Sequence, residues 1–169
     1  MPLDDVAASL TQLAAEVNAI PGVVAATGPV APQRLRLRDR IADPDLLKVS
    51  DRLFEDGHHA RAVEEAFKYL NNLVKARAGL PGLDGSGLMK TALSANRPML
   101  KLNAGATQSD RDEQLGYMEM CAGSMTGIRN PRAHEHDWED SEEHAVQMLV
   151  LADHLVGRVK TALKSARKS

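Results

Sequence analysis

The sequence predicts an all-α protein, an antiparallel bundle of about four main helices with an N-terminal helical or extended appendage. Apolar residues make up 43% of the 169 residues but aromatic residues only 3%, so the core must consist of Leu, Val, Ala and Met, which favours helices over strands. From Asp43 onward, apolar positions recur at spacings of three and four residues. Glycine- and proline-containing breaks separate these periodic stretches into individual helices.

Charge and composition limit the class of protein. The net charge of −2 means that any contact with nucleic acid must be local rather than spread over the whole surface. The single cysteine, Cys121, excludes an internal disulfide and a cysteine zinc site, and it fits a reducing compartment. No apolar run reaches the length of a membrane span, and the first residues do not resemble a signal peptide. We therefore expect a cytoplasmic protein with no membrane partner.

Residues 1–45 are expected to form an N-terminal unit distinct from the bundle, which is assigned to residues 46–169. An amphipathic helix is predicted from the apolar positions Leu3, Val6, Leu10, Leu13 and Val17. A loop rich in proline and glycine, "IPGVVAATGPVAP", follows it. In "QRLRLRDRI" arginines alternate with leucines from Arg34 to Arg40, which fits either a short strand or extended arm, or a solvated loop.

Local signals place the helices of the bundle. Pro44 suits a first helical turn, and Gly57 is expected to end or bend that helix. The next stretch, "HHARAVEEAFKYLNNLVKARAG", has a continuous apolar stripe and is expected to stop at Gly79. The connector "LPGLDGSGLMKTALS" lacks the spacing of a phosphate-binding loop and should enter a short helix near Leu88.

Capping patterns predict the last two main helices. Ser109 followed by Asp112 resembles an N-terminal capping box, and the apolar stripe of that helix runs as far as Ile128. The final helix is expected to begin near Asp140, with Glu143 as the third helical residue. Both helices present an apolar face, so each is expected to pack in the bundle.

The stretch "GIRNPRAHEH" contains several side chains that could take part in catalysis. Arg129 directly follows Ile128 and therefore lies at the edge of the buried face. Asn130 precedes Pro131, and because the residue before proline avoids the α region, the helix is expected to end or kink there. His134 follows about one turn later, close enough to share a pocket with Arg129 if the chain stays roughly helical.

This combination suits a phosphodiester substrate. Arg129 offers a permanent charge and a forked donor for phosphate oxygens, and His134 can transfer protons near neutral pH. Asn130 can orient the histidine or a ribose hydroxyl. No carboxylate cluster with metal-ligand spacing accompanies them, so we expect no metal ion and no cofactor. By spacing alone, the alternative also stands that Arg and His only complement the dipole at a helix C-terminus.

"RNPRAH" resembles the Arg-Asn-x-x-x-His signature of the HEPN superfamily, helical-bundle domains that include many metal-independent ribonucleases of bacterial toxins and phage defence. The stretches "LFEDGHHARAVEEAFKYLNNLVK" and "GLDGSGLM" and the final helix resemble one branch, the Ymh-like proteins. The resemblance covers roughly Leu46 to Leu163. It places the motif at the end of the penultimate main helix.

The resemblance implies a role for each motif residue. Arg129 would bind the scissile phosphate and stabilise its transition-state charge. His134 would move the proton of a ribose 2′-hydroxyl or of the leaving 5′-oxygen, and Asn130 would position the reacting groups. Arg132, at a variable position, could add a phosphate contact. Family ribonucleases leave a 2′,3′-cyclic phosphate, which selects RNA over DNA, and they usually act as homodimers with the two motifs facing each other.

The leading hypothesis is therefore a HEPN-type endoribonuclease, a toxin or phage-defence effector that acts on RNA. Its expected partners are RNA, a second copy of the chain in a composite active site, and an antitoxin or defence-system protein. The alternative is a non-catalytic HEPN-type dimer that binds a nucleotide or a partner protein. A third interpretation is a plain interaction bundle with no chemistry at this helix end.

Other histidines and the single tryptophan are further candidates for functional residues. His134 and His136 form an H-x-H pair, but residues two apart on a helix point about 200° away from each other, so only a loop could chelate a metal. His58 and His59 are interpreted as solvated residues at a helix start. Trp138 is expected to be a packing anchor beneath the last loop, with base stacking as the alternative.

Overall fold

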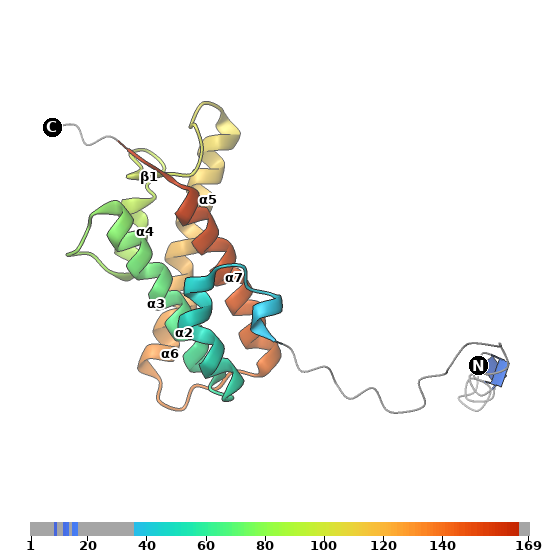
Figure 1. The fold of residues 1–169 in the computed structure, drawn as a ribbon. Helices are drawn as coiled ribbons and strands as arrows, with labels where there is room; N and C mark the ends of the chain where they lie inside the picture. The colour runs from blue at the N-terminus through green and yellow to red at the C-terminus, as the bar shows by residue number, and fades with distance from the viewer. Residues whose placement is uncertain (1–8, 10–11, 14, 17–35, 166–169) are drawn as a thin grey trace. The chain divides into compact units, whose positions relative to one another are not determined.

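The computed structural model describes residues 9, 12–13, 15–16 and 36–165 (Figure 1). The chain divides into two compact units, Met1–Arg34 and Leu35–Ser169. Within the first unit the described residues are helical, which confirms the predicted N-terminal helix at these positions. Gln12 Nε2 donates to Glu16 Oε1 at 3.3 Å, and these two residues are four apart, about one helical turn. The rest of that helix, the following loop and Arg34 lie outside the described residues.

The second unit is an all-α bundle, as the sequence predicts. Its helical elements are η1 (Leu37–Asp39), α2 (Pro44–Glu55), α3 (His59–Ala78), α4 (Gly85–Ala92), α5 (Gln108–Ser124), η2 (Met125–Arg129), α6 (Asn130–His134) and α7 (Glu142–Thr161). The central helix is α3, which packs against α2, α4, η2, α6 and α7. The described helices do not combine the length and apolarity that a membrane span requires.

Helix ends follow the predicted local signals in the first half of the bundle. Pro44 occupies the first turn of α2, and Asp43 Oδ1 accepts hydrogen bonds from the backbone N–H groups of Asp45 and Leu46 at 3.1 and 2.9 Å. Gly57 follows α2 with φ +82°, and Gly79 ends α3 with φ +68°. Both glycines adopt the left-handed conformation that other residues avoid, so both predictions are confirmed.

The two predicted capping positions in the second half are wrong by one or two residues. The capping box of α5 consists of Thr107 and Asp110, not Ser109 and Asp112. The N-cap of α7 is Ser141, whose hydroxyl accepts from His144 N at 3.2 Å. In each case a nearby hydroxyl, that of Thr107 or Ser141, accepts from a free N–H group of the first turn instead.

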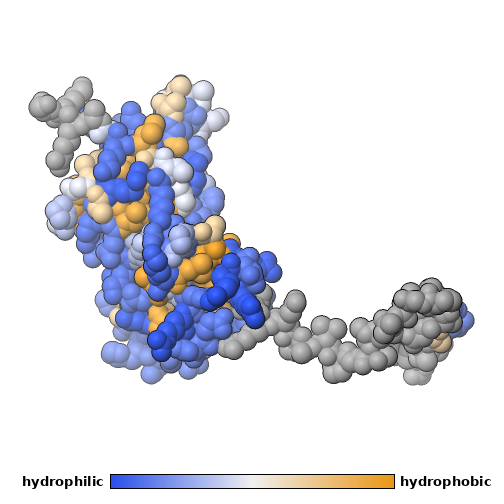
Figure 2. All heavy atoms as spheres, in the orientation of Figure 1, coloured by the Kyte–Doolittle hydropathy of each residue, from blue (hydrophilic) through white to orange (hydrophobic). Residues whose placement is uncertain are grey.

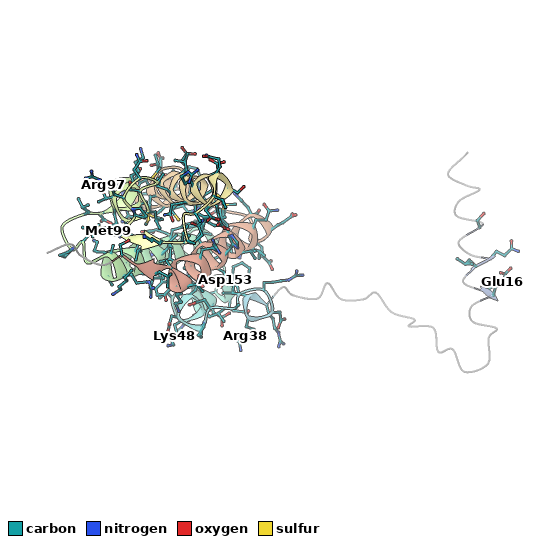
Figure 3. The ribbon with its side chains drawn as sticks, turned by 90° about the horizontal axis from the view of Figure 1, so that it is seen from above. Glu16, Arg38, Lys48, Arg97, Met99 and Asp153 are labelled. Atoms are coloured by element: carbon teal, nitrogen blue, oxygen red, sulfur yellow. The ribbon has the colours of Figure 1, made fainter. Side chains whose placement is uncertain are left out.

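The core surrounds α3, and α2, α4, α5, η2, α7 and η1 all contribute buried side chains to it. Its fully buried large side chains include Phe67, Leu70, Leu88, Met89, Leu93, Leu100, Met125, Leu149 and Leu155. Leu37 and Ile41, which the sequence analysis placed in the N-terminal unit, pack in the same core. The Arg–Leu alternation is therefore neither a strand nor a solvated loop at the described residues, because η1 buries Leu37 while Arg38 faces outward and pairs with Asp51 at 2.7 Å (Figure 3).

A short antiparallel ribbon was not predicted. Leu100 of β1 (Leu100–Lys101) pairs with Lys164 of β2 (Leu163–Lys164), and Lys101 pairs with Leu163. Two-residue strands are too short to show a period in the sequence. The ribbon lies at the opposite end of the bundle from α6 (Figure 1). The outward face in this view is mostly hydrophilic, with apolar side chains showing in patches between polar ones (Figure 2).

Candidate functional site

The motif lies on a continuous helical segment in which α5, η2 and α6 follow one another. In η2 the backbone is π-helical, and Asn130 N–H donates to the carbonyl of Met125, five residues earlier. Asn130 has φ −64° and ψ −44°, so the predicted break before Pro131 is wrong. The helix instead ends at His134, after which Glu135 is extended with φ −98° and ψ 112°.

Pro131 gives a physical reason for the π-helical turn. Proline has no N–H, and its ring clashes with the carbonyl oxygen four residues earlier in a regular α-helix. A wider turn immediately before Pro131 makes room for the ring without ending the helix. Insertions of this kind occur frequently at functional sites, because they change the direction in which the following side chains point.

Arg129 is the last residue of η2 and is half-buried. Its Nη1 donates to Asn130 Oδ1 at 3.2 Å. Its Nε is buried and has no hydrogen-bond partner among the described residues. A buried donor without an acceptor is costly, so an atom of this kind marks a position where an acceptor from a ligand would be favourable. The structure thus brings two of the three predicted site residues, Arg129 and Asn130, into contact.

His134 ends α6 and is exposed. Within the described structure, no hydrogen bond or ion pair joins its side chain to Arg129. Residues five apart on a helix are separated by about 7.5 Å along the axis and by about 140° around it. Within one chain, Arg129 and His134 therefore do not form a single hydrogen-bonded site.

Arg132, which the sequence analysis considered as a further phosphate contact, is held inside the protein. Its Nε and Nη2 donate to the two carboxylate oxygens of Asp140 at 2.6 and 2.7 Å, and its Nη1 donates to the carbonyl of Ile128 at 2.7 Å. The side chains of Arg132 and Asp140 are only 2% and 1% exposed. Because Arg132 is buried and its charge is compensated by Asp140, its side chain is not exposed to a substrate.

The loop after α6 is fastened to the start of α3. Trp138 Nε1 donates to Asp140 Oδ1 at 3.3 Å, and its ring lies 5.3 Å from the Arg132 guanidinium carbon. His59 Nδ1 lies 3.3 Å from the carbonyl oxygen of Asp140 and, because that oxygen can only accept, donates to it. Together these contacts hold the loop in place, but Trp138 is 39% exposed and lies at the surface rather than beneath the loop as predicted. A cavity of about 370 Å³ lies between Gly57–Arg61 and Trp138–Asp140.

A second polar group, missed by the sequence analysis, surrounds Asp84, the N-cap of α4. Burial alone would raise the pKa of Asp84, but hydrogen bonds from Gly85 and Asn71, followed by the charges of Lys75 and Arg129, outweigh that effect and lower it. Asn71 is buried, and its Oδ1 also accepts from Gly85 N at 2.9 Å. The contact between Asn71 of α3 and the start of α4 joins residues fourteen apart in the chain, so no local sequence signal could have identified it.

Metal ligands do not converge anywhere in the described part of the chain. No group of three or more His, Cys, Asp or Glu side chains there could hold a metal ion. Cys121 is buried, and this burial raises the pKa of its thiol to about 12, so it is an inert core residue rather than a nucleophile.

The fold and the motif together define an all-α helical bundle with an Arg-Asn-x-x-x-His sequence on its penultimate helical segment. A family model described as "Protein of unknown function (Hypoth_Ymh)" matches residues 40–159, and the chain belongs to this family. The match includes the whole segment from α2 to the motif and nearly all of α7. No curated protein and no solved structure matches the chain significantly.

Proposed function

We propose that this protein is a metal-independent endoribonuclease of the HEPN type, a toxin or phage-defence effector. The observation that carries the proposal is the half-buried Arg129, which contacts Asn130 and has an unpaired buried Nε, followed by an exposed His134 at the end of the same helical segment. An arginine fork with free donors suits a phosphate, and an exposed histidine can exchange protons with a bound substrate.

The proposed reaction is an internal transfer at phosphorus. The ribose 2′-oxygen attacks the phosphorus, the bond from phosphorus to the 5′-oxygen breaks, and a 2′,3′-cyclic phosphate forms. One histidine takes the 2′-hydroxyl proton, and a second supplies a proton to the leaving 5′-oxygen. Arg129 stabilises the negative charge that builds up on the phosphate oxygens.

A homodimer forms part of this proposal, because it would supply the second histidine. The exposed side of α5 supports it: Leu115 and Met120 are 39% and 44% exposed. On the same helix, a Cβ added at Gly116 or Gly123 would meet no heavy atom within 4 Å. Close approach of a second copy along this side would place two motif segments near each other. An antitoxin or a defence-system protein remains the proposed regulatory partner.

The test of the activity is cleavage of total RNA and tRNA by purified protein in the presence of EDTA. We expect fragments that end in cyclic phosphate, and we expect Arg129→Ala and His134→Ala to abolish them. Wild-type protein that does not cut RNA would overturn the proposal and favour the non-catalytic nucleotide- or protein-binding alternative. Equal cleavage by wild type and both variants would identify a contaminating nuclease.

The homodimer is tested separately with Gly123→Arg. Because the added side chain extends into open space within one chain, the fold should be retained while a second copy is displaced. We expect light scattering to give a dimer mass for the wild type and a monomer mass for Gly123→Arg, with RNA cleavage lost in the monomer. A wild type that is monomeric and active would contradict the paired site.

A further inference from the structure

The lysines and arginines of the described bundle differ in whether a carboxylate lies within ion-pair distance. Many lysines and arginines have a carboxylate partner, such as Arg38 with Asp51 at 2.7 Å and Lys48 with Asp45 at 2.8 Å. A group of cations around the β1–β2 ribbon has no carboxylate within ion-pair distance among the described residues. This group, the ribbon cations, comprises Arg77, Arg97, Lys101, Arg111 and Lys164.

Two neighbouring cavities bring four of the ribbon cations together. A cavity of about 530 Å³ is lined by Arg77 and Lys164, and a second one of about 260 Å³ is lined by Lys101 and Arg111. Pro98 lines both cavities, so they adjoin each other. Seen from above, Arg97 and Met99 lie on the opposite side of the bundle from Arg38 and Lys48 (Figure 3).

The charges of these arginines are not neutralised by their hydrogen bonds. Arg77 Nη2 donates to the carbonyl of Ala162 at 2.6 Å, and its Nε is buried without a partner among the described residues. Arg111 donates through Nε and Nη2 to the neutral Oε1 of Gln108 at 3.3 and 3.0 Å. The lining of the smaller cavity also holds one acid, Asp110, which accepts from the backbone N–H groups of Ala106 and Thr107, keeps its charge and offsets part of the charge of Arg111.

The opposite end of the bundle offers little positive charge besides Arg129. The loop that follows His134 has the sequence "EHDWEDSEE", in which acidic residues far outnumber basic ones. The negative charge of this loop opposes phosphate binding around the motif, and Arg132 is already neutralised by Asp140. An RNA substrate needs a second source of positive charge, and phosphate contacts of this kind dominate affinity for nucleic acid.

We propose that the ribbon cations bind backbone phosphates of RNA. The inference rests on the proposed ribonuclease function and assigns the surface that holds the substrate away from the cleavage motif. The lining of the smaller cavity includes Asn96 and Asn103 and no aromatic or branched aliphatic side chain, which fits solvated phosphates rather than insertion into a lipid bilayer.

The test compares two double lysine variants that remove the same net charge. Lys101→Gln/Lys164→Gln removes two exposed ribbon cations, and the control Lys48→Gln/Lys68→Gln removes two exposed lysines that have carboxylate partners. Both are made in the His134→Ala protein so that RNA stays intact. Binding of a labelled 20-residue oligouridylate is followed by fluorescence anisotropy between 50 and 300 mM salt.

We expect the ribbon variant to bind about 10-fold more weakly at low salt and the control variant to bind less than about twofold more weakly. The log–log salt slope of the ribbon variant should fall by about 1.4, because each phosphate contact to a single strand contributes about 0.7. Equal weakening by both variants would show that only net charge matters and would overturn the inference, as would unchanged binding by the ribbon variant.

The outcomes separate this inference from the proposed activity. If wild-type protein cuts RNA but the ribbon lysines do not affect binding, the ribonuclease stands and the surface assignment falls. If wild-type protein does not cut RNA but the ribbon variant binds it less well, the surface stands and the ribonuclease falls. Vesicles containing phosphatidylserine serve as a second polyanion: loss of vesicle binding alone would assign the surface to a membrane instead of RNA and overturn the inference.

Discussion

Arg129 and Arg132 are three residues apart in one motif, yet their environments are opposite. Arg132 is almost completely buried, and all three of its nitrogens donate to acceptors within the chain. Arg129 is half-buried, donates a hydrogen bond to the neighbouring Asn130, and keeps a buried Nε without a hydrogen-bond partner among the described residues. The difference separates an arginine that holds the fold together from one that is available to a ligand.

The largest expected effect concerns the buried pair. Arg132→Ala would leave Asp140 uncompensated in the interior, and breaking such a pair costs about 3–5 kcal/mol of unfolding free energy. The matched control is Arg158→Ala. Arg158 also lies over an aromatic ring, that of Tyr117, and pairs with an acid, Glu113, but the side chains of Arg158 and Glu113 are 30% and 40% exposed. The control should cost about 1 kcal/mol or less. Urea denaturation measures both, and similar losses would contradict the structural role of Arg132.

The second largest effect concerns catalysis rather than stability. His134→Ala should lower the rate of RNA cleavage by a factor of about 10²–10⁴, since that is the usual contribution of a general acid or base. His136→Ala, two residues further along and outside α6, serves as the matched control and should cut RNA at nearly the wild-type rate. A larger loss in His136→Ala than in His134→Ala would move the site out of the motif.

Local signals made much of the fold predictable. Pro44 and Gly79 each determine a helix end through their own backbone geometry, and such signals can be read without knowledge of the tertiary structure. The capping positions were missed because several hydroxyls and acids competed within a few residues. Asp140 was predicted to cap α7, but Arg132 takes its carboxylate and Ser141 caps the helix instead.

The candidate site was predictable only in part, because its environment depends on non-local packing. The motif gives the identities of Arg129, Asn130 and His134, but not which arginine is buried. The burial of Arg132 depends on the path of the loop that returns Asp140. This contact has no sequence period or turn signature that could reveal it.

A smaller effect tests whether the core beneath the π-helical segment is closed. Burial raises the pKa of Cys121 to about 12, whereas a thiol in the unfolded chain ionises near 8.5. Above pH 8.5 the unfolded state alone loses the proton, so the folded state becomes less stable as pH rises toward 12. At pH 10 the wild type should have lost about 1–2 kcal/mol more than Cys121→Ala, relative to pH 7. Identical pH profiles in urea denaturation would show that the thiol is accessible in the folded state.

The smallest expected effect on stability comes from the proline that accompanies the π-helical turn. Pro131→Ala restores an N–H and permits a regular α-helix, so the unfolding free energy should change by less than about 1 kcal/mol. The rotation of Arg129 relative to Asn130 would nevertheless change, and cleavage should fall about 10-fold if the π turn positions the arginine. Paired urea denaturation and RNA cleavage measure this, and full activity in Pro131→Ala would show that the π turn has no part in the reaction.

The most direct test of the central claim is the single-turnover rate of RNA cleavage, per folded molecule, for wild type, Arg129→Ala and Arg132→Lys in EDTA. We expect Arg129→Ala to lose at least about 100-fold in rate with an unchanged unfolding midpoint, because it removes transition-state stabilisation and not a structural contact. Arg132→Lys should lower the unfolding midpoint, because lysine cannot reproduce the bidentate pair, while each folded molecule cuts nearly as fast as wild type. Cleavage by Arg129→Ala at the wild-type rate would contradict the account.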